Sequence, residues 1–435
     1  MSEKKERGLW ELYAKDAEKA DAQIWGRKSN PLTRRGFIKT SGLAAMTMAI
    51  GSQIPFFRNM PDGFIPLAFA ETNDQKVIEG KEGLIVLNDR PVNIEPPAHL
   101  LDDEFTPNEK HFVRNNGLPP EGKIDANKWM LTVNGEVHKP LQISLGELKG
   151  KFKHHTYALQ LECGGNGRAG YNPPAKGNQW KFGAVGCAKY KGVRLGDVLK
   201  AAELKGSAIY TGYYGADFHL SGNLDKEALS RGTPIPKALD DHTIIAWEMN
   251  GEPLPKLHGF PLRLITPGWP GSASPKWLNK IWVRDRIHDG MKMNKYRVPK
   301  YPVKPGTPVP LEDMAIIESM PVKSLITNPR TGIQIPMGNN LEVRGHAWAG
   351  DRSVRAVHVS INFGRTWKKT DLKKPVNRYA WQNWNTVIQF PTQGYYEVWV
   401  RATDSKEEMQ PMVVPGWNPS GYINNAMHRI SITVG

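Results

Sequence analysis

Apolar and polar residues alternate in three segments near the end of the chain. A period of two is typical of a strand that buries one of its faces. Short strands of this kind, separated by turn residues, predict a β-sandwich of the immunoglobulin-like type. The apolar positions are Val357, Val359, Ile361 and Phe363, then Tyr396, Val398, Val400 and Ala402, and finally Ile430, Ile432 and Val434.

The part of the chain before the sandwich has a mixed pattern. Residues 130–133 (Met-Leu-Thr-Val) are typical of a strand, and residues 195–199 (Leu-Gly-Asp-Val-Leu) fit a short helix. We therefore expect an α+β domain here. Five prolines between residues 299 and 310 favour extended, unpaired backbone and predict a linker between the two domains.

The N-terminal part has the layout of an export signal. Residues 34–39 (Arg-Arg-Gly-Phe-Ile-Lys) match the twin-arginine pattern, residues 40–57 carry no charge, and residues 68–70 (Ala-Phe-Ala) offer a small-residue cleavage site. A retained membrane anchor is the alternative, but glycine and proline interrupt a stretch shorter than the roughly 20 apolar residues of a span. We expect export to the periplasm in the folded state. This route is typical of proteins that receive a cofactor in the cytoplasm before export.

Together these patterns divide the chain into four parts. Residues 1–70 are an N-terminal extension with the signal peptide, and residues 71–298 are the α+β domain. Residues 299–312 are the proline-rich linker, and residues 313–435 are the sandwich.

Composition narrows the classes of site. The 435 residues include 42 glycines and 34 prolines, which favours turn-rich β structure over a helix bundle. Two cysteines cannot build a disulfide framework, a cysteine-rich zinc site or a four-thiolate iron–sulfur cluster. The chain has no Cys-x-x-Cys-His motif, so we expect no covalently attached haem.

The net charge of +15 indicates an anionic partner. A small oxyanion, an acidic protein and nucleic acid would all fit a basic surface. Lysines and arginines are dispersed among acidic residues and form no dense runs with interleaved aromatics, so we do not expect nucleic acid binding.

Cys163 is the most reactive candidate in the chain. It begins a glycine-rich turn after a strand-like run that starts at Thr156, and glycines leave room for the sulfur to reach something bulky. Arg168 and Lys151 would favour the thiolate, which binds a soft metal or attacks an electrophile. The alternatives are a buried cysteine that packs as a small apolar residue and a disulfide with Cys187.

The sequence around Cys163 resembles a known family. Residues 162–168 (Glu-Cys-Gly-Gly-Asn-Gly-Arg) are similar to the molybdenum-cysteine loop of the sulfite oxidase family. The resemblance covers roughly residues 84–300, and the sandwich resembles the family's dimerisation domain. The other matching segments are residues 112–116, 247–255, 258–263, 267–268 and 276–278.

This resemblance implies a molybdenum cofactor with one pyranopterin dithiolene per chain. Cys163 would bind the molybdenum through its thiolate. A phosphate dianion on the pterin is best bound by cationic donors. The positions that the resemblance assigns to the cofactor are Phe112, Arg114, Asn116, Asp217, His258, Arg263 and Lys276.

An anion pocket beside the metal is also implied. Arg114 and Arg168 would hold the oxygens of sulfite, whose sulfur would face the metal. Tyr296 would be the active-site tyrosine, with Tyr301 as an alternative. Arg378 is a further candidate that would reach the pocket from the sandwich domain.

The implied activity is oxidation of sulfite to sulfate by oxygen-atom transfer. Residues 71–100 are too few for the haem domain of the animal enzymes, so the electrons would pass to an external c-type cytochrome or a similar acceptor. Asn116, also a candidate catalytic residue, stands where animal enzymes have histidine, and Gly167 stands where they have a second arginine. In these features the chain is similar to exported bacterial sulfite dehydrogenases.

Other functions stay open at this point. The chain is equally similar to the molybdenum subunit of the sulfur-oxidising (Sox) sulfane dehydrogenase, whose substrate is a tethered persulfide. A methionine sulfoxide reductase is disfavoured because such relatives lack the sandwich. A cofactor-free, exported binding or assembly protein is the alternative from a different class. The sandwich would pair two copies of the chain or bind a cytochrome subunit.

Overall fold

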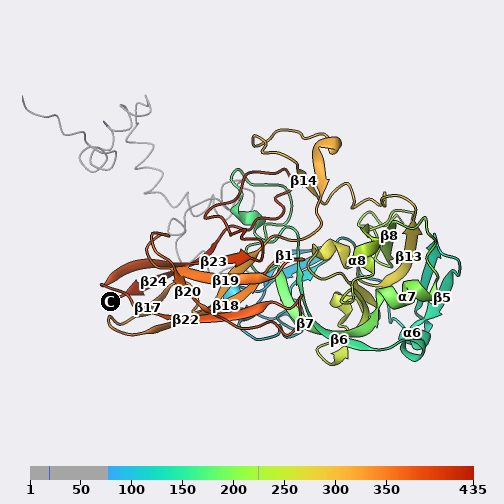
Figure 1. Cartoon of the computed structure of the whole chain (residues 1–435), viewed down its shortest axis with the longest axis horizontal. Coiled ribbons are helices and arrows are strands. Elements are labelled where there is room, and N and C mark those ends of the chain that lie inside the picture. Colours follow the sequence, from blue (N-terminus) through green and yellow to red (C-terminus); the bar gives the residue numbers. More distant parts are fainter. Residues whose placement is uncertain (1–18, 20–76, 224) are drawn as a thin grey trace, which may run out of the picture. The chain divides into compact units, whose positions relative to one another are not determined.

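The computed structural model describes Lys19, residues 77–223 and residues 225–435 (Figure 1). The expected twin-arginine signal at residues 34–70 lies outside the described residues. Within the described part of the chain, none of the helices combines the length and the apolar character needed to cross a bilayer. The first domain below means residues 77–298, and the second domain means residues 313–435.

The first domain is built on three sheets. A five-stranded sheet contains the strand that leads to Cys163, β6, which pairs with β7 over its whole length, from His155 opposite Gly192 to Glu162 opposite Val185. The strands of this sheet are β6 (His155–Glu162), β7 (Val185–Arg194), β10 (Ile244–Met249), β11 (Glu252–Pro253) and β12 (Arg263–Ile265).

The first domain also contains a second five-stranded sheet and a three-stranded sheet. The second five-stranded sheet has the order β5 (Leu141–Ser144), β4 (Met130–Gly135), β13 (Leu278–Arg284), β8 (Tyr210–Gly215) and β9 (Ser230–Pro234). The small sheet has the order β1 (Ile85–Asp89), β2 (Val92–Glu95) and β3 (Val113–Arg114). The strand expected at residues 130–133 is therefore confirmed as part of β4.

Helices are few and short in the described residues. The α-helices of residues 77–223 and 225–435 are α6 (Leu145–Lys151), α7 (Leu195–Ala201) and α8 (Ile235–Ala238), and α7 confirms the helix expected at residues 195–199. α6 begins with a capping box, in which Ser144 Oγ accepts from the Glu147 N–H and the Ser144 N–H donates to the Glu147 carboxylate. The described chain is thus mostly β structure.

The second domain is a sandwich of two sheets, as expected. One has the order β16 (Lys323–Asn328), β18 (Leu341–Trp348), β22 (Gln382–Ile388) and β21 (Asp371–Leu372). The other has the order β17 (Ile333–Ile335), β24 (His428–Val434), β23 (Gly394–Asp404), β19 (Val354–Ser360) and β20 (Lys368–Lys369). Figure 1 shows these strands grouped together, apart from α6 and α7.

One expected strand is shorter than its pattern. β19 ends at Ser360, so Ile361 and Phe363 lie beyond it, and Phe363 is 58% exposed. The cause is a polar turn: Ser360 Oγ accepts from the Gly364 N–H at 3.0 Å, and Asn362 Oδ1 accepts from the Thr366 N–H at 2.9 Å. These local bonds compete with the ladder and end the strand.

The proline-rich segment forms a loop as well as a connection. β14 (Arg297–Pro299) and β15 (Met314–Ile316) pair antiparallel at its two ends. Proline has no N–H to give to a ladder, so the pairing is confined to the base of the loop. In Figure 1 β14 stands at this base.

The two domains share a hydrophobic cluster. Leu101 and Val185 of the first domain pack with Leu325, Trp348 and Trp381 of the second, and all five are buried. Residues 77–223 and 225–435 accordingly lie in one compact unit. The second domain is therefore fixed against the strands that lead into the Cys163 loop.

Candidate active site

The Cys163 loop is a tight turn at the end of β6. The Cys163 N–H donates to the Ala184 carbonyl at 2.9 Å, and the Cys163 carbonyl accepts from the Asn166 N–H at 2.9 Å. Gly167 has φ of +91°, and a Cβ at Gly164 would lie 3.3 Å from the Cβ of Pro270. Glycine suits both positions, since Gly167 has a backbone angle that side chains rarely adopt and a side chain at Gly164 would crowd Pro270.

The loop presents Cys163 to a cavity. This cavity contains about 670 Å³ of atom-free space, part of which is open to solvent. Nine of the eleven sequence-predicted site residues line it: Phe112, Arg114, Asn116, Cys163, Asp217, His258, Arg263, Lys276 and Tyr296.

Positive charge dominates the cavity wall. Burial, together with the charge of Arg263, holds the pKa of Lys276 well below its usual value. Burial also raises the pKa of Asp217, the carboxylate in the wall, to about 6, although Lys276 opposes this shift. Mutual repulsion of enclosed cations is relieved by a bound anion.

His258 lies among these cations as a neutral ring. Burial and the charge of Lys81 lower its pKa well below the usual value. Lys81 Nζ lies 2.9 Å from His258 Nε2 and also donates to the His111 carbonyl at 2.8 Å. Sequence reasoning missed Lys81, because nothing in its glycine-flanked turn signals a partner 177 residues away.

Several buried donors in this wall or next to it in the sequence lack a hydrogen-bond partner among the described residues. They are Arg263 Nε and Trp277 Nε1 in the wall, and Nδ2 of Asn115, which stands between the lining residues Arg114 and Asn116 in the sequence. Unpaired buried donors are costly in a folded protein, and a polar ligand in the cavity would give these donors an acceptor. A thiol beside such donors and cations fits a cofactor that joins a soft metal to a phosphate-bearing ring system.

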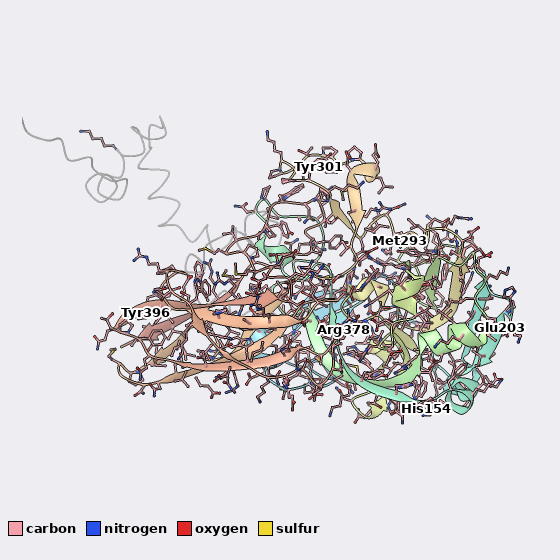
Figure 2. All side chains as sticks on the ribbon, viewed as in Figure 1. His154, Glu203, Met293, Tyr301, Arg378 and Tyr396 are labelled. Atoms are coloured by element: carbon pink, nitrogen blue, oxygen red, sulfur yellow. The ribbon has the colours of Figure 1, made fainter. Side chains whose placement is uncertain are left out.

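The tyrosine in the cavity is Tyr296. It is 4% exposed, and its ring stacks on that of Tyr422, with centroids 5.0 Å apart. The alternative, Tyr301, is 50% exposed and donates to Asp313 at 2.7 Å (Figure 2). Tyr301 is not among the residues that line the cavity.

Arg168 does not line the cavity, contrary to the position expected for it. It is buried behind the Cys163 loop, where its Nε donates to the Ser420 carbonyl at 2.7 Å and its NH1 donates to the Asn178 carbonyl at 2.8 Å. A Cβ at Gly165 would lie 2.4 Å from the Arg168 guanidinium, so the glycine-rich turn leaves room for the arginine. Packing of the turn, which no local pattern reveals, sets this orientation.

Two other cations also lie away from the cavity. Arg378 is exposed and donates to the Asp351 carbonyl at 2.8 Å, so it does not reach into the cavity from the second domain (Figure 2). Lys151, expected to favour the thiolate, forms a solvent-exposed ion pair with Glu147 at 2.7 Å in α6. Its effect on Cys163 is therefore not supported.

Both cysteines are free and buried. Cys187 lies opposite Gln160 in the ladder of β6 and β7, and burial raises its pKa to about 12. The disulfide between Cys163 and Cys187, an alternative left open by the sequence, is absent in the described chain, and Cys187 packs as a small apolar residue.

The second domain contributes to the Cys163 loop in a way that sequence reasoning missed. The Ile423 N–H donates to the Gly164 carbonyl at 2.9 Å, and Asn424 Nδ2 donates to the Gly167 carbonyl at 2.7 Å. The loop is thus held by one main-chain and one side-chain hydrogen bond from a segment more than 250 residues away.

Comparison with protein-family models agrees with this geometry. Residues 117–292 match the oxidoreductase molybdopterin binding domain, and residues 314–435 match the Mo-co oxidoreductase dimerisation domain. Sulfite oxidase of Gallus gallus is 36% identical over 361 residues, which cover 80% of this chain and 77% of that protein. The chain belongs to the sulfite oxidase family of molybdopterin oxidoreductases.

A second sulfite oxidase and a solved structure extend the comparison. The mitochondrial sulfite oxidase of Rattus norvegicus is 32% identical over 367 residues, which cover 81% of this chain and 66% of that protein. The sulfane dehydrogenase SoxCD from Paracoccus pantotrophus has a similar structure, with a TM-score of 0.66 and 25% identity. That similarity covers 87% of this chain and 94% of the SoxCD chain.

Proposed function

We propose that this protein oxidises sulfite to sulfate with a molybdopterin cofactor and passes the electrons to an external c-type cytochrome or a comparable acceptor. The observation that carries the proposal is the meeting of Cys163 with Arg114, Lys276 and Tyr296 in one cavity. The similarity to sulfite oxidases over most of the chain supports the choice of substrate.

The cavity residues divide into two groups by their chemistry. Cys163 would bind the metal through its sulfur, and Arg263 and Lys276, with neutral His258 and with Asp217, would hold the pterin and its phosphate. When bound, the cofactor takes up two electrons from the substrate and supplies the oxygen atom. One pterin per chain fits one such cavity.

On the substrate side, Arg114 contributes a guanidinium to the cavity wall. Its NH2 donates to Asn116 Oδ1 at 3.0 Å and its NH1 donates to Asn93 Oδ1 at 3.3 Å, which hold the side chain in one orientation. A fixed guanidinium binds the oxygens of a small dianion and leaves its sulfur free to react. The Tyr296 hydroxyl would be a further donor to these oxygens.

Molybdenum analysis and a substrate assay test the proposal together. Protein matured in cells that synthesise the cofactor should contain about one molybdenum atom per chain. It should reduce cytochrome c in the presence of sulfite, with sulfate as the product. A fully matured protein that contains no molybdenum would instead be a binding or assembly protein.

A sulfane dehydrogenase is the second candidate, and the structural similarity to SoxCD favours it. The same cytochrome assay with a protein-bound persulfide as the electron donor separates the two. Turnover of the persulfide without turnover of sulfite would replace the first proposal by the second.

Export and assembly are proposed from the sequence. We expect the mature protein in the periplasmic fraction, and replacing both Arg34 and Arg35 by lysine should retain it in the cytoplasm. The match to a dimerisation domain supports an oligomer. Light scattering of the purified protein would distinguish a homodimer from a heteromer with a cytochrome subunit.

A further inference from the structure

Two tyrosines are stacked between two arginines next to the Cys163 loop. The Arg168 guanidinium carbon lies 5.1 Å from the centroid of the Tyr422 ring. That ring stacks on Tyr296, with centroids 5.0 Å apart and an interplanar angle of 21°. The guanidinium carbon of Arg231 lies 5.1 Å from the Tyr296 ring. We call these four residues the Arg–Tyr column.

Only one member of the column lines the cavity. Tyr296 does, whereas Arg168, Tyr422 and Arg231 are not among the lining residues. The orientation of the Tyr296 ring in the cavity is therefore set by side chains behind it. Stacked aromatic rings and cations over ring faces both have preferred geometries, so the neighbours restrict the ring.

Arg231 is a fixed end of the column. It is fully buried, and it donates to Ser272 Oγ at 3.1 Å and to the Ile317 carbonyl. Burial lowers its pKa to about 10, while Tyr296 raises it, so the side chain stays cationic at neutral pH. Tyr296 thus has a permanent positive charge over one ring face.

Tyr422 is held in the column by its backbone. Its N–H donates to Asn418 Oδ1 at 3.0 Å, and its carbonyl accepts from the Tyr171 hydroxyl at 2.7 Å. Within the described part of the chain, its own hydroxyl has no hydrogen bond assigned to it. A Cβ added at Gly164 would lie 3.7 Å from the Tyr422 ring and 3.8 Å from the Tyr296 ring, so both rings pack on the loop of Cys163.

We propose that Tyr422, a residue of the second domain, is a positioning residue for the active site. Its ring, backed by Arg168, sets the orientation of Tyr296 and thereby the affinity of the cavity for an oxyanion. The inference rests on the proposed function, because it assigns Tyr296 to oxyanion binding. It also gives Arg168 a route to the substrate pocket, through Tyr422, although Arg168 does not line the cavity.

Two substitutions distinguish the contribution of the Tyr422 ring from that of its hydroxyl. Tyr422→Phe keeps the stack, and Tyr422→Leu removes it. In the molybdenum-loaded protein, Tyr422→Leu should raise KM for sulfite roughly fivefold, the factor expected for one stacked aromatic pair. The kcat of Tyr422→Leu should change less than its KM. The KM of Tyr422→Phe should stay close to the wild-type value.

A matched control and an independent readout accompany these variants. Tyr395, 61% exposed on β23, is outside the column, so Tyr395→Leu should leave KM unchanged. Titration calorimetry with sodium sulfate measures oxyanion affinity without turnover, and Tyr422→Leu should weaken sulfate binding by the same factor as KM. Arg168→Met should weaken it too, and the double variant should lose less than the product of the two factors.

The outcomes distinguish this inference from the proposed function. Weakened sulfate binding in Tyr422→Leu, in a protein that does not oxidise sulfite, would retain the column and overturn the proposed function. Sulfite oxidation with unchanged KM in Tyr422→Leu would overturn the column alone. Equal losses in Tyr422→Phe and Tyr422→Leu would overturn the role of the stacked ring, because phenylalanine keeps the ring and removes only the hydroxyl. A loss of molybdenum from Tyr422→Leu would reduce the residue to a structural role.

Discussion

The ammonium group of Lys323 lies 2.6 Å from the carboxylate of Glu162, the residue directly before Cys163. Lys323 belongs to the second domain and Glu162 to the end of β6, and both side chains are almost fully buried. Trp348 Nε1 and Asn166 Nδ2 also donate to the carboxylate, at 2.8 and 3.0 Å. A buried ion pair is tolerated only when hydrogen bonds complete it, and here they join the two domains at the Cys163 loop.

Removing the lysine of this pair should be strongly destabilising. Lys323→Met leaves the Glu162 carboxylate buried without its cation, and we expect a loss of about 3–5 kcal/mol in the free energy of unfolding. Urea denaturation measures this loss. Lys368, exposed on β20, provides the control, since Lys368→Met should change stability little. Equal stability of the two variants would show that the pair does not hold the domains together.

The two cysteines should respond in opposite ways to substitution. Cys163→Ser replaces the soft sulfur in the cavity by a hard oxygen, so molybdenum retention and sulfite oxidation should both be lost. Cys187→Ala removes a buried thiol outside the cavity and should retain both. Metal analysis and turnover are measured on the same preparations. Full turnover by a metal-loaded Cys163→Ser protein would remove the assigned role.

The sequence predicted best where a strand has one face in the core. The alternation at residues 396–402 and 430–434 is that of β23 and β24, whose apolar side chains fill the sandwich. It predicted less well at the end of β19, because the side chains of Ser360 and Asn362 bond to the backbone of the next turn. Such bonds depend on rotamers, which alternation does not encode.

Some residues of the candidate site could be predicted from the sequence, and others could be found only in the structure. Residues within the motifs, such as Cys163 and Lys276, lie in the cavity because each motif is a continuous piece of backbone around it. Lys81 and Tyr422 could not be found from local pattern, because each meets the site only through the folding of distant segments. Arg168 lies in a motif, yet its side chain points behind the loop to the carbonyls of Asn178 and Ser420.

Arg114 and Arg378 were both candidates for substrate binding, and the structure separates them. Arg114 lines the cavity, whereas Arg378 is exposed and bonds to a backbone carbonyl of its own domain. Arg114→Met should raise KM for sulfite by roughly ten- to hundredfold, since hydrogen bonds to charged groups are lost. Arg378→Met should leave KM unchanged in the same steady-state assay. A similar rise in both variants would return Arg378 to the substrate pocket.

Glu95 should make stability depend on pH. Its carboxylate is 1% exposed and accepts from the backbone N–H groups of Lys181 and Gly183 at 2.8 and 3.0 Å. Burial outweighs these bonds and raises the pKa of Glu95 from 4.5 to about 7. Between these two values the folded protein binds a proton that the unfolded chain releases, so the contribution of Glu95 to stability falls as the pH rises.

Glu95→Gln tests this contribution because glutamine does not titrate. Urea unfolding at several values between pH 4.5 and 8 gives the free energy of unfolding of wild type and variant. The value for wild type minus the value for the variant should fall as the pH rises. Glu121, which is exposed, is the matched site, and Glu121→Gln should follow the wild-type profile. Parallel profiles for Glu95→Gln and wild type would mean that Glu95 is already ionised in the folded protein at low pH.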